Sequence, residues 1–253
     1  MKISIVTTSF NSATTIRDTI DSVLSQDYPD LEYIIADGNS KDGTKEILES
    51  YDDPRIVWFS ESDRGIYDGM NKGLKMASGE VVGILNSDDF YKDSRVISKI
   101  AKEFINTDAE AVFGDVRFVN PQKLNRTVRY YSSKFFNPSW FRYGFMPAHP
   151  TFFTRKMWFE EFGYYQTDYK IAADYELLTR FLYKHKLPYR YVPLDMIIMR
   201  TGGASTKSIY SNYILNKEIV RGCKENGIKT YLGVLAFKYF VKVFELMPRW
   251  KVS

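Results

Sequence analysis

Two adjacent carboxylates follow an apolar segment in the first half of the chain. Residues 81–85 have the length and composition of a buried strand, and they lead directly into Asn86, Ser87, Asp88 and Asp89. In open α/β sheets, ligands bind at the carboxyl ends of the strands. Because two like charges in that position are costly without a cation between them, the pattern predicts a metal and phosphate site. A solvated turn or a helix cap is the alternative, since Asp is common in both.

Two further acidic loops follow predicted strands. Asp37 comes directly after a strand predicted at residues 32–36, and Glu61 and Asp63 come after one predicted at residues 55–59. If these strands are parallel, all three acidic loops meet at one edge of the sheet. Oxygen-rich sites of this kind suit Mg²⁺ or Mn²⁺, which hold a substrate diphosphate through few protein ligands. Each loop taken alone also fits a solvated turn.

A further carboxylate, Asp174, stands near the start of a strongly amphipathic helix predicted at residues 171–184. It lies three and four residues before Leu177 and Leu178, on the helix face that these side chains bury. This position suits a general base that takes a proton from a hydroxyl nucleophile. A first-turn aspartate that is favoured by the helix dipole is the alternative.

The chain contains two histidines, and one of them, His149, stands between prolines ahead of a predicted strand. An imidazole can ligate a metal ion or contact a phosphate, so His149 is a candidate ligand. A purely structural histidine is the alternative.

The elements that must position these residues alternate between strand and helix. Four strands are predicted in the first part of the chain, at residues 3–7, 32–36, 55–59 and 81–85. Three helices alternate with them, a rhythm that predicts a parallel sheet with right-handed connections. After a helix at residues 94–104 the pattern changes, and residues 111–119 and 127–131 resemble antiparallel strands. We therefore expect one continuous domain with a parallel first half and a mixed second half.

Composition and motif absences exclude several classes of protein. The 253 residues carry 44% apolar and 26% charged side chains and a net charge of +4, too small to indicate a nucleic-acid partner. The single cysteine, Cys223, excludes an intramolecular disulfide and fits a reducing compartment. We expect neither a signal peptide nor a membrane-spanning helix. No P-loop motif occurs and no GxGxxG follows the first strand, which argues against a kinase, a P-loop NTPase or a dinucleotide oxidoreductase.

Five segments, in order and spacing, resemble the family 2 glycosyltransferases of the GT-A fold. They are TTSFN at 7–11, DGNSKDGT at 37–44, NKG with ASGE at 71–80, NSD at 86–88 and ADYE at 173–176. The resemblance implies an α/β GT-A fold, with a mixed, mostly parallel central sheet flanked by helices. Residues 1–205 would form one catalytic domain, with a Rossmann-like nucleotide-sugar half at 1–90 and an acceptor half at 91–205. A C-terminal amphipathic helical tail at 206–253 would complete the chain.

The resemblance also implies roles for individual residues. Asp174 would be the catalytic base of an inverting transfer. The expected donor-binding residues are Thr8, Phe10, Asn11, Asp37, Asp63, Arg64, Asn71, Lys72, Asn86 and Ser87. A divalent metal, Mn²⁺ or Mg²⁺, would be held by Asp88, with Asp89 and His149 as further candidate ligands. The donor would be a nucleotide sugar, with UDP expected as the nucleotide.

Residues 60–73 and 149–153 narrow the resemblance to bacterial enzymes that build colanic acid, capsule or O-antigen. Two departures from the family pattern matter. Asn86 replaces the first acid of the family's DxD motif, so metal binding rests on Asp88 and leaves Asn86 for ribose or water. Met70 stands where many relatives carry Arg, so Lys72 and Arg64 are the candidates to meet the diphosphate charge.

The apolar pattern near the end of the chain predicts a helix that associates with a membrane or with another protein surface. Residues 231–247 form a wide apolar face with a narrow polar stripe, and basic residues and Trp250 follow, which suits a helix lying in a membrane interface. Docking on the catalytic domain, or on a second subunit in a homodimer, is the alternative. The glycine-rich residues 200–205 either close over the donor or form a plain surface loop. A glycan or polyprenyl-linked acceptor and a cytoplasmic enzyme, peripheral on the inner face of the membrane, fit this interpretation.

Two other functions remain open at the level of sequence. A sugar-phosphate nucleotidyltransferase shares α/β architecture and a carboxylate-held metal, but would attack phosphorus. No glycine-rich, basic loop of the sort that holds a nucleoside triphosphate follows the first strand. A non-catalytic protein that binds sugar nucleotides or glycans is the other alternative, because Asn86 and Met70 depart from the family pattern.

Overall fold

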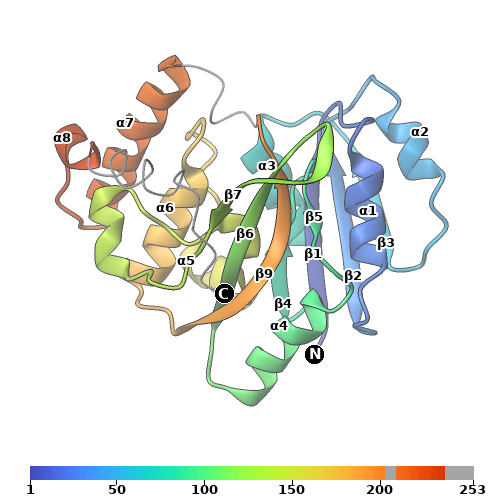
Figure 1. Ribbon diagram of the computed structural model, residues 1–253, viewed down its shortest axis with the longest axis horizontal. Coiled ribbons are helices and arrows are strands. Elements are labelled where there is room, and N and C mark those ends of the chain that lie inside the picture. The colour runs from blue at the N-terminus through green and yellow to red at the C-terminus, as the bar shows by residue number, and fades with distance from the viewer. Residues whose placement is uncertain (203–208, 237–253) are drawn as a thin grey trace.

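A mixed sheet of nine strands runs through the part of the chain that the computed structural model describes, residues 1–202 and 209–236 (Figure 1). Its strand order is β3-β2-β1-β4-β8-β6-β9-β5, and β7 pairs with β6. The first four strands are β1 (Ile3–Ser9), β2 (Leu31–Asp37), β3 (Ile56–Ser60) and β4 (Val81–Ile84). They are joined by α1 (Ile16–Leu24), α2 (Thr44–Glu49) and α3 (Ile66–Met76). All four strands are parallel, as predicted, so their carboxyl ends share one edge of the sheet.

The second half is mixed, as predicted. Its strands are β5 (Phe90–Tyr91), β6 (Ala111–Asn120), β7 (Lys123–Tyr131), β8 (Phe153–Arg155) and β9 (Tyr189–Arg200). β7 and β8 are antiparallel to β6, whereas β9 is parallel to it. The helices are α4 (Val96–Asn106), α5 (Met157–Phe162), α6 (Ala173–Thr179), α7 (Ile209–Glu225) and α8 (Leu232–Leu235). Short 3₁₀ turns cover Pro138–Tyr143 and His149–Thr151, and a π-helical turn, Arg180–Lys184, continues α6.

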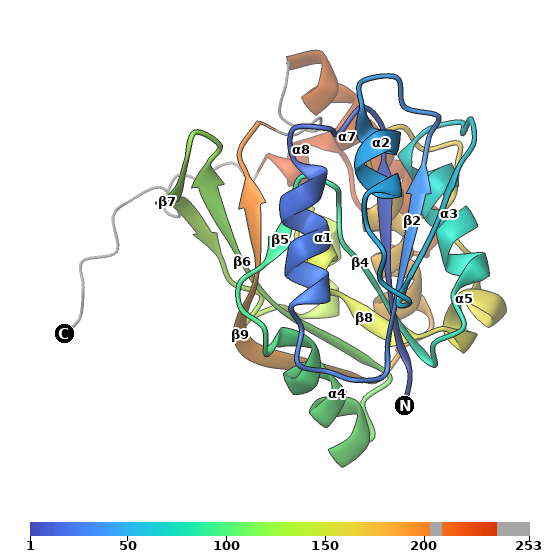
Figure 2. The same cartoon turned by 90° about the vertical axis from the view of Figure 1, so that its right-hand side faces the viewer.

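Helices cover both faces of the sheet and bury two separate apolar layers (Figure 2). Ile3 and Ile5 of β1 pack with α1 and α4 on one face, whereas Val6 packs with α3 and the region of α6 on the other. This division follows from the alternation of side chains along a strand. Helix α3 lies especially close to β1, because a Cβ atom at Gly73 would overlap the side chain of Val6.

The described part of the predicted C-terminal tail packs against the rest of the molecule. Helix α7 lies against α6 and buries Ile219 and Cys223, and α8 contacts α7 and the 3₁₀ turn at Pro138–Tyr143. From residue 237 onward the predicted membrane-interface helix lies outside the described residues, and so does half of the predicted donor-covering loop, residues 203–205. Within the described residues, no helix is long and apolar enough to cross a membrane.

Candidate active site

Hydrogen bonds connect the loops at the carboxyl ends of β1, β2, β3 and β4. Ser12, after β1, lies 2.8 Å from the Ser87 hydroxyl, after β4. The backbone N–H of Asn11 donates to the Ser40 hydroxyl at 2.8 Å, which joins the loops after β1 and β2. Ser60, at the end of β3, donates to the Asp37 carboxylate at 2.6 Å. The predicted donor-binding loops therefore meet at one edge of the sheet.

The side chains of Phe10 and Asp63 both lie close to Gly38, in the loop after β2. Phe10 is 64% exposed, so its ring is available for stacking. A Cβ atom at Gly38 would come within 2.7 Å of the Asp63 carboxylate and 3.3 Å of the Phe10 ring. Only glycine allows both side chains to approach the loop this closely. Helix α3 lies against the same carboxylate, since a Cβ atom at Gly69 would lie 3.3 Å from Asp63 and 3.1 Å from Thr8.

The Asp37 carboxylate is buried and engaged within its own loop. It accepts hydrogen bonds from the backbone N–H and hydroxyl of Ser40 and from the hydroxyl of Ser60. Its role toward the nucleotide base stays a prediction. By contrast, the buried hydroxyls of Thr8 and Ser9, at the end of β1, have no hydrogen-bond partner among the described residues. Buried polar groups without partners are rare and often mark a ligand site.

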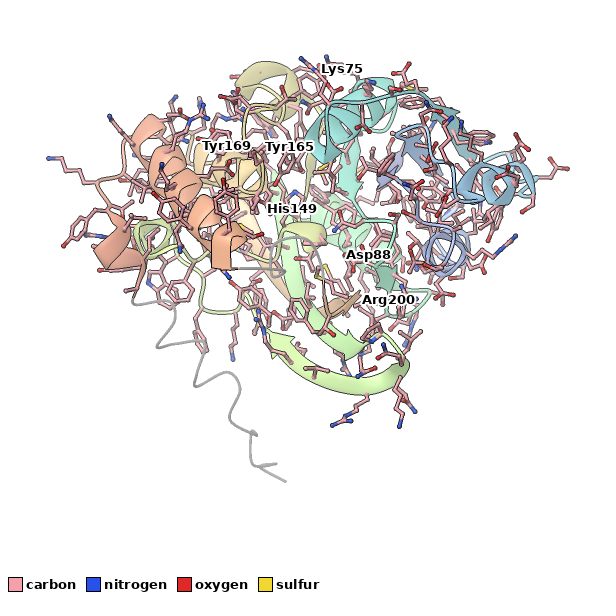
Figure 3. All side chains as sticks on the ribbon, turned by 90° about the horizontal axis from the view of Figure 1, so that it is seen from above. Lys75, Asp88, His149, Tyr165, Tyr169 and Arg200 are labelled. Carbon is pink, nitrogen blue, oxygen red and sulfur yellow. The ribbon has the colours of Figure 1, made fainter. Side chains whose placement is uncertain are left out.

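The two carboxylates after β4 differ sharply in their surroundings. Asp89 is fully buried, and it accepts a hydrogen bond from the Asn86 amide at 3.0 Å. Burial, together with the nearby charge of Asp88, raises the pKa of Asp89 well above its ordinary value. Asp88 is only half-buried, and its backbone carbonyl accepts a hydrogen bond from Arg200 at the end of β9 (Figure 3). Arg200 is also paired with Asp18 of α1, so it connects the loop after β4 to this helix.

Asp88 fits a divalent metal that is held mainly by its ligand. Its carboxylate makes no hydrogen bond or ion pair with the described residues, whereas the Asp89 carboxylate is buried and already accepts a hydrogen bond from Asn86. Among the described residues, no group of three or more His, Cys, Asp or Glu side chains could hold a metal ion. Mg²⁺ and Mn²⁺ commonly use one or two carboxylates and complete their coordination with phosphate oxygens and water. A carboxylate at Asp88 fits that pattern, and the metal role of Asp89 stays a prediction.

Asp174 is half-buried in the first turn of α6. Its Oδ1 accepts a 2.7 Å hydrogen bond from the backbone N–H of Tyr175 and lies 3.5 Å from the Tyr67 hydroxyl. Burial raises the pKa of Asp174 to about 6. Tyr67 belongs to α3, and Gly69 of the same helical turn lies against Thr8 and Asp63 of the nucleotide loops. Helix α3 therefore begins between the nucleotide loops and the candidate base.

Two predicted site residues have partners inside the protein instead. The side-chain amide of Asn71 donates to the carbonyl of Tyr165 at 2.8 Å and accepts from its N–H at 2.9 Å. His149 is buried, and its Nε2 lies 2.7 Å from the Tyr165 hydroxyl (Figure 3). Burial lowers the pKa of His149 to about 4, so the ring is neutral at pH 7. The geometry gives both residues a part in orienting Tyr165, whose ring stacks on Tyr67.

The two predicted diphosphate-binding cations are both paired with acids. Lys72 lies 2.9 Å from Glu61 and 3.8 Å from Asp68, and Arg64 lies 3.0 Å from Asp68. These pairs are partly exposed, so they are weak and can exchange for a phosphate. Met70 is buried in the apolar layer between α3 and the sheet.

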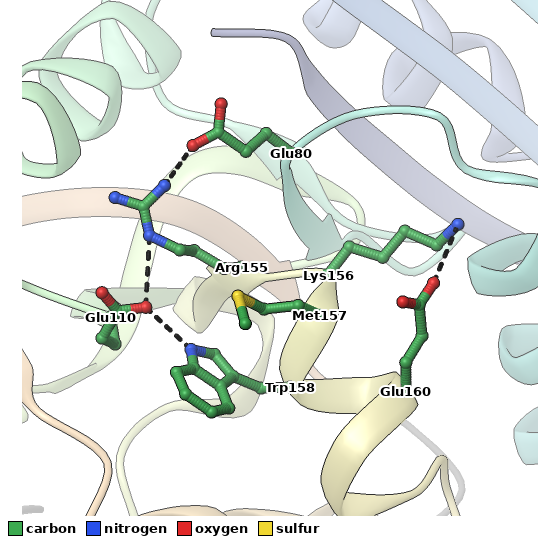
Figure 4. Close-up of a pocket in the computed structure, with 7 residues that line it drawn as sticks. All are labelled: Glu80, Glu110, Arg155, Lys156, Met157, Trp158 and Glu160. Carbon is green, nitrogen blue, oxygen red and sulfur yellow. Dashed lines mark hydrogen bonds and ion pairs between the residues drawn. The ribbon is translucent and has the colours of Figure 1, made fainter.

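A separate pocket of about 540 Å³ lies at the other end of β4 (Figure 4). The charged side chains that line this pocket pair with one another. Arg155 bridges Glu80 and Glu110, and the Trp158 indole donates to Glu110 at 2.8 Å. Glu80 directly precedes β4, whereas Asp88 follows its other end, so this pocket is distinct from the candidate active site.

Residues 4–163, more than half of the chain, match the family described as Glycosyl transferase family 2. The chain therefore belongs to this family and is a glycosyltransferase. A PGL/p-HBAD biosynthesis glycosyltransferase of Mycobacterium bovis is 25% identical over 252 residues, 98% of this chain and 90% of that protein. TuaG of Bacillus subtilis, named for teichuronic acid biosynthesis, is 41% identical over 97 residues, 37% of this chain and 38% of that protein.

Solved structures confirm the GT-A fold. TarS of S. aureus in complex with UDP aligns with a TM-score of 0.67 at 18% identity, over 100% of this chain and 76% of that one. The mannosyltransferase PcManGT of Pyrobaculum calidifontis, in complex with GDP-Man and Mn²⁺, aligns with a TM-score of 0.62 at 18% identity. That alignment covers 97% of this chain and 72% of the mannosyltransferase.

Three residues make contacts at the site that the sequence did not predict. Tyr67 contacts Asp174 across 107 positions, and Arg200 contacts Asp88 across 112. Glu218 of α7 binds the backbone directly before α6, 46 to 48 positions away. Local spacing carries no information about such contacts, because the fold alone brings these segments together.

Proposed function

We propose that this enzyme is a metal-dependent inverting glycosyltransferase that moves a sugar from a UDP-sugar to a hydroxyl group of a glycan or lipid-linked acceptor. The product belongs to a bacterial surface polysaccharide. The observation that carries the proposal is the environment of Asp174, a half-buried carboxylate beside Tyr67 whose pKa is raised to about 6. A base with that pKa is ionised at neutral pH and still accepts a proton readily.

In this proposal, the residues that activate the acceptor and those that bind the donor lie on different sides of α3. Asp174 takes the proton from the acceptor hydroxyl, which attacks the anomeric carbon of the donor from the face opposite the leaving group. Phe10, Gly38 and Asp63 hold the nucleotide base, and the Thr8 hydroxyl offers a hydrogen bond. A divalent cation at Asp88 would neutralise the charge that develops on the leaving nucleoside diphosphate.

The comparisons support a nucleotide-sugar donor and a metal ion. TarS has been solved with UDP and with UDP-GlcNAc, and PcManGT with GDP-Man and Mn²⁺. TuaG is named for teichuronic acid biosynthesis, which supports a polysaccharide product.

The test is UDP release from a panel of UDP-sugars during a Mn²⁺ titration, with and without acceptor, combined with calorimetric UDP binding. Asp174→Asn is expected to lower turnover about 10²–10⁴-fold while UDP affinity stays within twofold. Asp88→Ala is expected to weaken the Mn²⁺-dependent part of UDP binding.

In the parent enzyme, turnover should fall about tenfold per pH unit below pH 6, because protonated Asp174 cannot act as a base. Asp108→Asn, at an exposed site, is the matched control.

The outcomes separate this proposal from its rivals. An Asp174→Asn enzyme with undiminished turnover would sink the assignment of the base. Diphosphate release from a nucleoside triphosphate and a sugar phosphate would identify a nucleotidyltransferase. UDP binding without turnover for any sugar, metal or acceptor would identify a non-catalytic binding protein.

We also propose peripheral contact with the inner face of the cytoplasmic membrane. No Asp or Glu occurs between Asp115 and Glu160, a stretch that contains the β6–β7 hairpin. Exposed cations and aromatic rings occur together in this stretch, namely Lys123, Arg126, Lys134, Phe135 and Trp140. Cations attract anionic lipid headgroups and aromatic rings favour the interface, which supports a lipid-linked acceptor.

A further inference from the structure

Helix α7 reaches back to the segment that leads into the candidate base. The Glu218 carboxylate accepts hydrogen bonds from three consecutive backbone N–H groups, those of Lys170 at 2.8 Å and of Ile171 and Ala172 at 2.9 Å each. Asp174 follows this segment by two residues, in the first turn of α6. Glu218 therefore holds the backbone at the point from which Asp174 projects.

The start of α6 lacks a cap of its own. The capping position is Ala172, which has no side-chain oxygen to accept a hydrogen bond from the exposed N–H groups of the first turn. The Glu218 carboxylate, on another helix, accepts instead from the N–H groups of the three residues that lead into this turn, and its negative charge is favourable near a helix N-terminus. The backbone at the start of α6 is therefore stabilised by a residue 46 positions later in the chain.

The same segment is fixed from its other side. The Tyr67 hydroxyl, on α3, donates to the carbonyl of Ile171 and also lies 3.5 Å from Asp174. Helix α7 is itself anchored, because Ile219 is buried and the Asn226 amide donates to Glu176 of α6 at 3.1 Å. The acceptor-side backbone is therefore clamped between α3 and α7.

We propose that Glu218 is a positioning residue for Asp174, and that α7 is a working part of the active site. By fixing residues 170–172, Glu218 sets the direction of the Asp174 carboxylate toward the acceptor hydroxyl. The inference rests on the proposed role of Asp174 as the base. It also extends the catalytic unit beyond residue 205, the predicted end of the catalytic domain.

Glu218 also affects the pKa of Asp174. Burial is the main cause that raises the pKa of Asp174, and the negative charge of Glu218 adds to it. The other polar groups that face this region are Tyr67 from α3 and Tyr165 with its neighbour Arg180. Removing the charge of Glu218 therefore lowers the pKa of Asp174, and the acid limb of the pH–rate profile moves to lower pH.

The test compares Glu218→Gln with the parent full-length enzyme. We expect amide hydrogen exchange at residues 170–172 to accelerate at least tenfold, and turnover of UDP-sugar to fall at least tenfold. UDP affinity should stay within twofold, because the nucleotide loops are untouched. Glu218→Asp keeps the charge on a shorter side chain, so it should recover part of the rate and leave the acid limb in place. Should Glu218→Gln fail to fold, Glu218→Asp measured in the same assays carries the test.

The control is Glu225→Gln, which removes a carboxylate from the same helix together with its hydrogen bond from the Tyr169 hydroxyl, and leaves the acceptor of the N–H groups of residues 170–172 in place. Unchanged amide exchange, or unchanged turnover, in Glu218→Gln would overturn the inference. Faster exchange and lost turnover in Glu218→Gln, together with full turnover in Asp174→Asn, would instead overturn the proposed base. The two failures are therefore distinguishable.

Discussion

At the scale of the residue, Asp174 is held in a state that is unfavourable for stability and that suits its proposed role as a base. Its carboxylate is half-buried, and burial raises its pKa from 3.8 to about 6. A raised pKa means that the ionised form is disfavoured in the folded protein relative to the unfolded chain. Active sites often carry such a cost.

Asp174→Asn is therefore expected to stabilise the protein at pH 8. The gain should be about 1–2 kcal/mol after allowance for partial exposure, or a few degrees in the melting temperature. The parent protein regains this stability as the pH falls through about 6 toward 3.8, so the difference should vanish below pH 4. Thermal melts from pH 4 to pH 8 measure it, with Asp108→Asn as the control. A pH-independent difference would contradict the assignment of the raised pKa.

The residues that sequence patterns predicted best are those next to strand ends. Asp37, Asp63 and Asp88 follow β2, β3 and β4, and a parallel sheet brings such positions to one edge. The partners of those residues were not predictable, because a side chain such as Arg200 or Glu218 reaches the site from a distant element. The sequence also could not show whether a buried amide or imidazole binds a ligand or a partner within the protein, as Asn71 and His149 illustrate.

At the scale of the element, the alternation of strand and helix predicted the parallel half well. Each strand there is a compact apolar run with a polar loop after it. Strand β9, at Tyr189–Arg200, was not predicted, because Pro193 and Asp195 interrupt its apolar pattern. Its pairing with β6 contains irregular register on both sides of Asp115, which a two-residue period cannot describe.

Helix α3 carries the contact between the two sides of the site, and Gly73 sets its distance from β1. A Cβ atom there would overlap Val6, so Gly73→Ala should cost about 1–3 kcal/mol of the free energy of unfolding. Gly222→Ala in α7 is the matched control, because its nearest neighbour, Glu176, would lie at an ordinary 3.4 Å. That change should be neutral or stabilise by up to about 1 kcal/mol. Urea unfolding measures both, and a Gly73→Ala protein of parent stability would refute the close contact.

At the scale of the whole molecule, charge is distributed unevenly along the chain. The acid-free stretch between Asp115 and Glu160 should bind anionic membranes. Replacing Lys123, Arg126 and Lys134 together by Glu is expected to lower binding to phosphatidylglycerol vesicles at least about tenfold, at roughly 1 kcal/mol per lost cation. Vesicle sedimentation of the full chain at fixed salt measures the change, and pure phosphatidylcholine vesicles give the baseline.

A control variant has to carry the same change in net charge at another place. Lys102, Lys184 and Lys186 are exposed and lie outside the acid-free stretch, so their replacement by Glu serves this purpose. Equal losses of binding in the two triple variants would mean that net charge alone, and not this surface, attracts the protein to the membrane.

The contact between Asn71 and Tyr165 has a consequence for how such enzymes can be recombined. Asn71 belongs to the parallel first half of the chain, yet both of its amide atoms bind the backbone of Tyr165 in the mixed second half, at 2.8 and 2.9 Å. A chimera that joins two relatives near residue 90 would form this contact, and that of Tyr67 to Ile171, between segments from different parents. Such a chimera therefore needs a first half with Asn71 and Tyr67 and a second half whose backbone follows the same course near Tyr165 and Ile171.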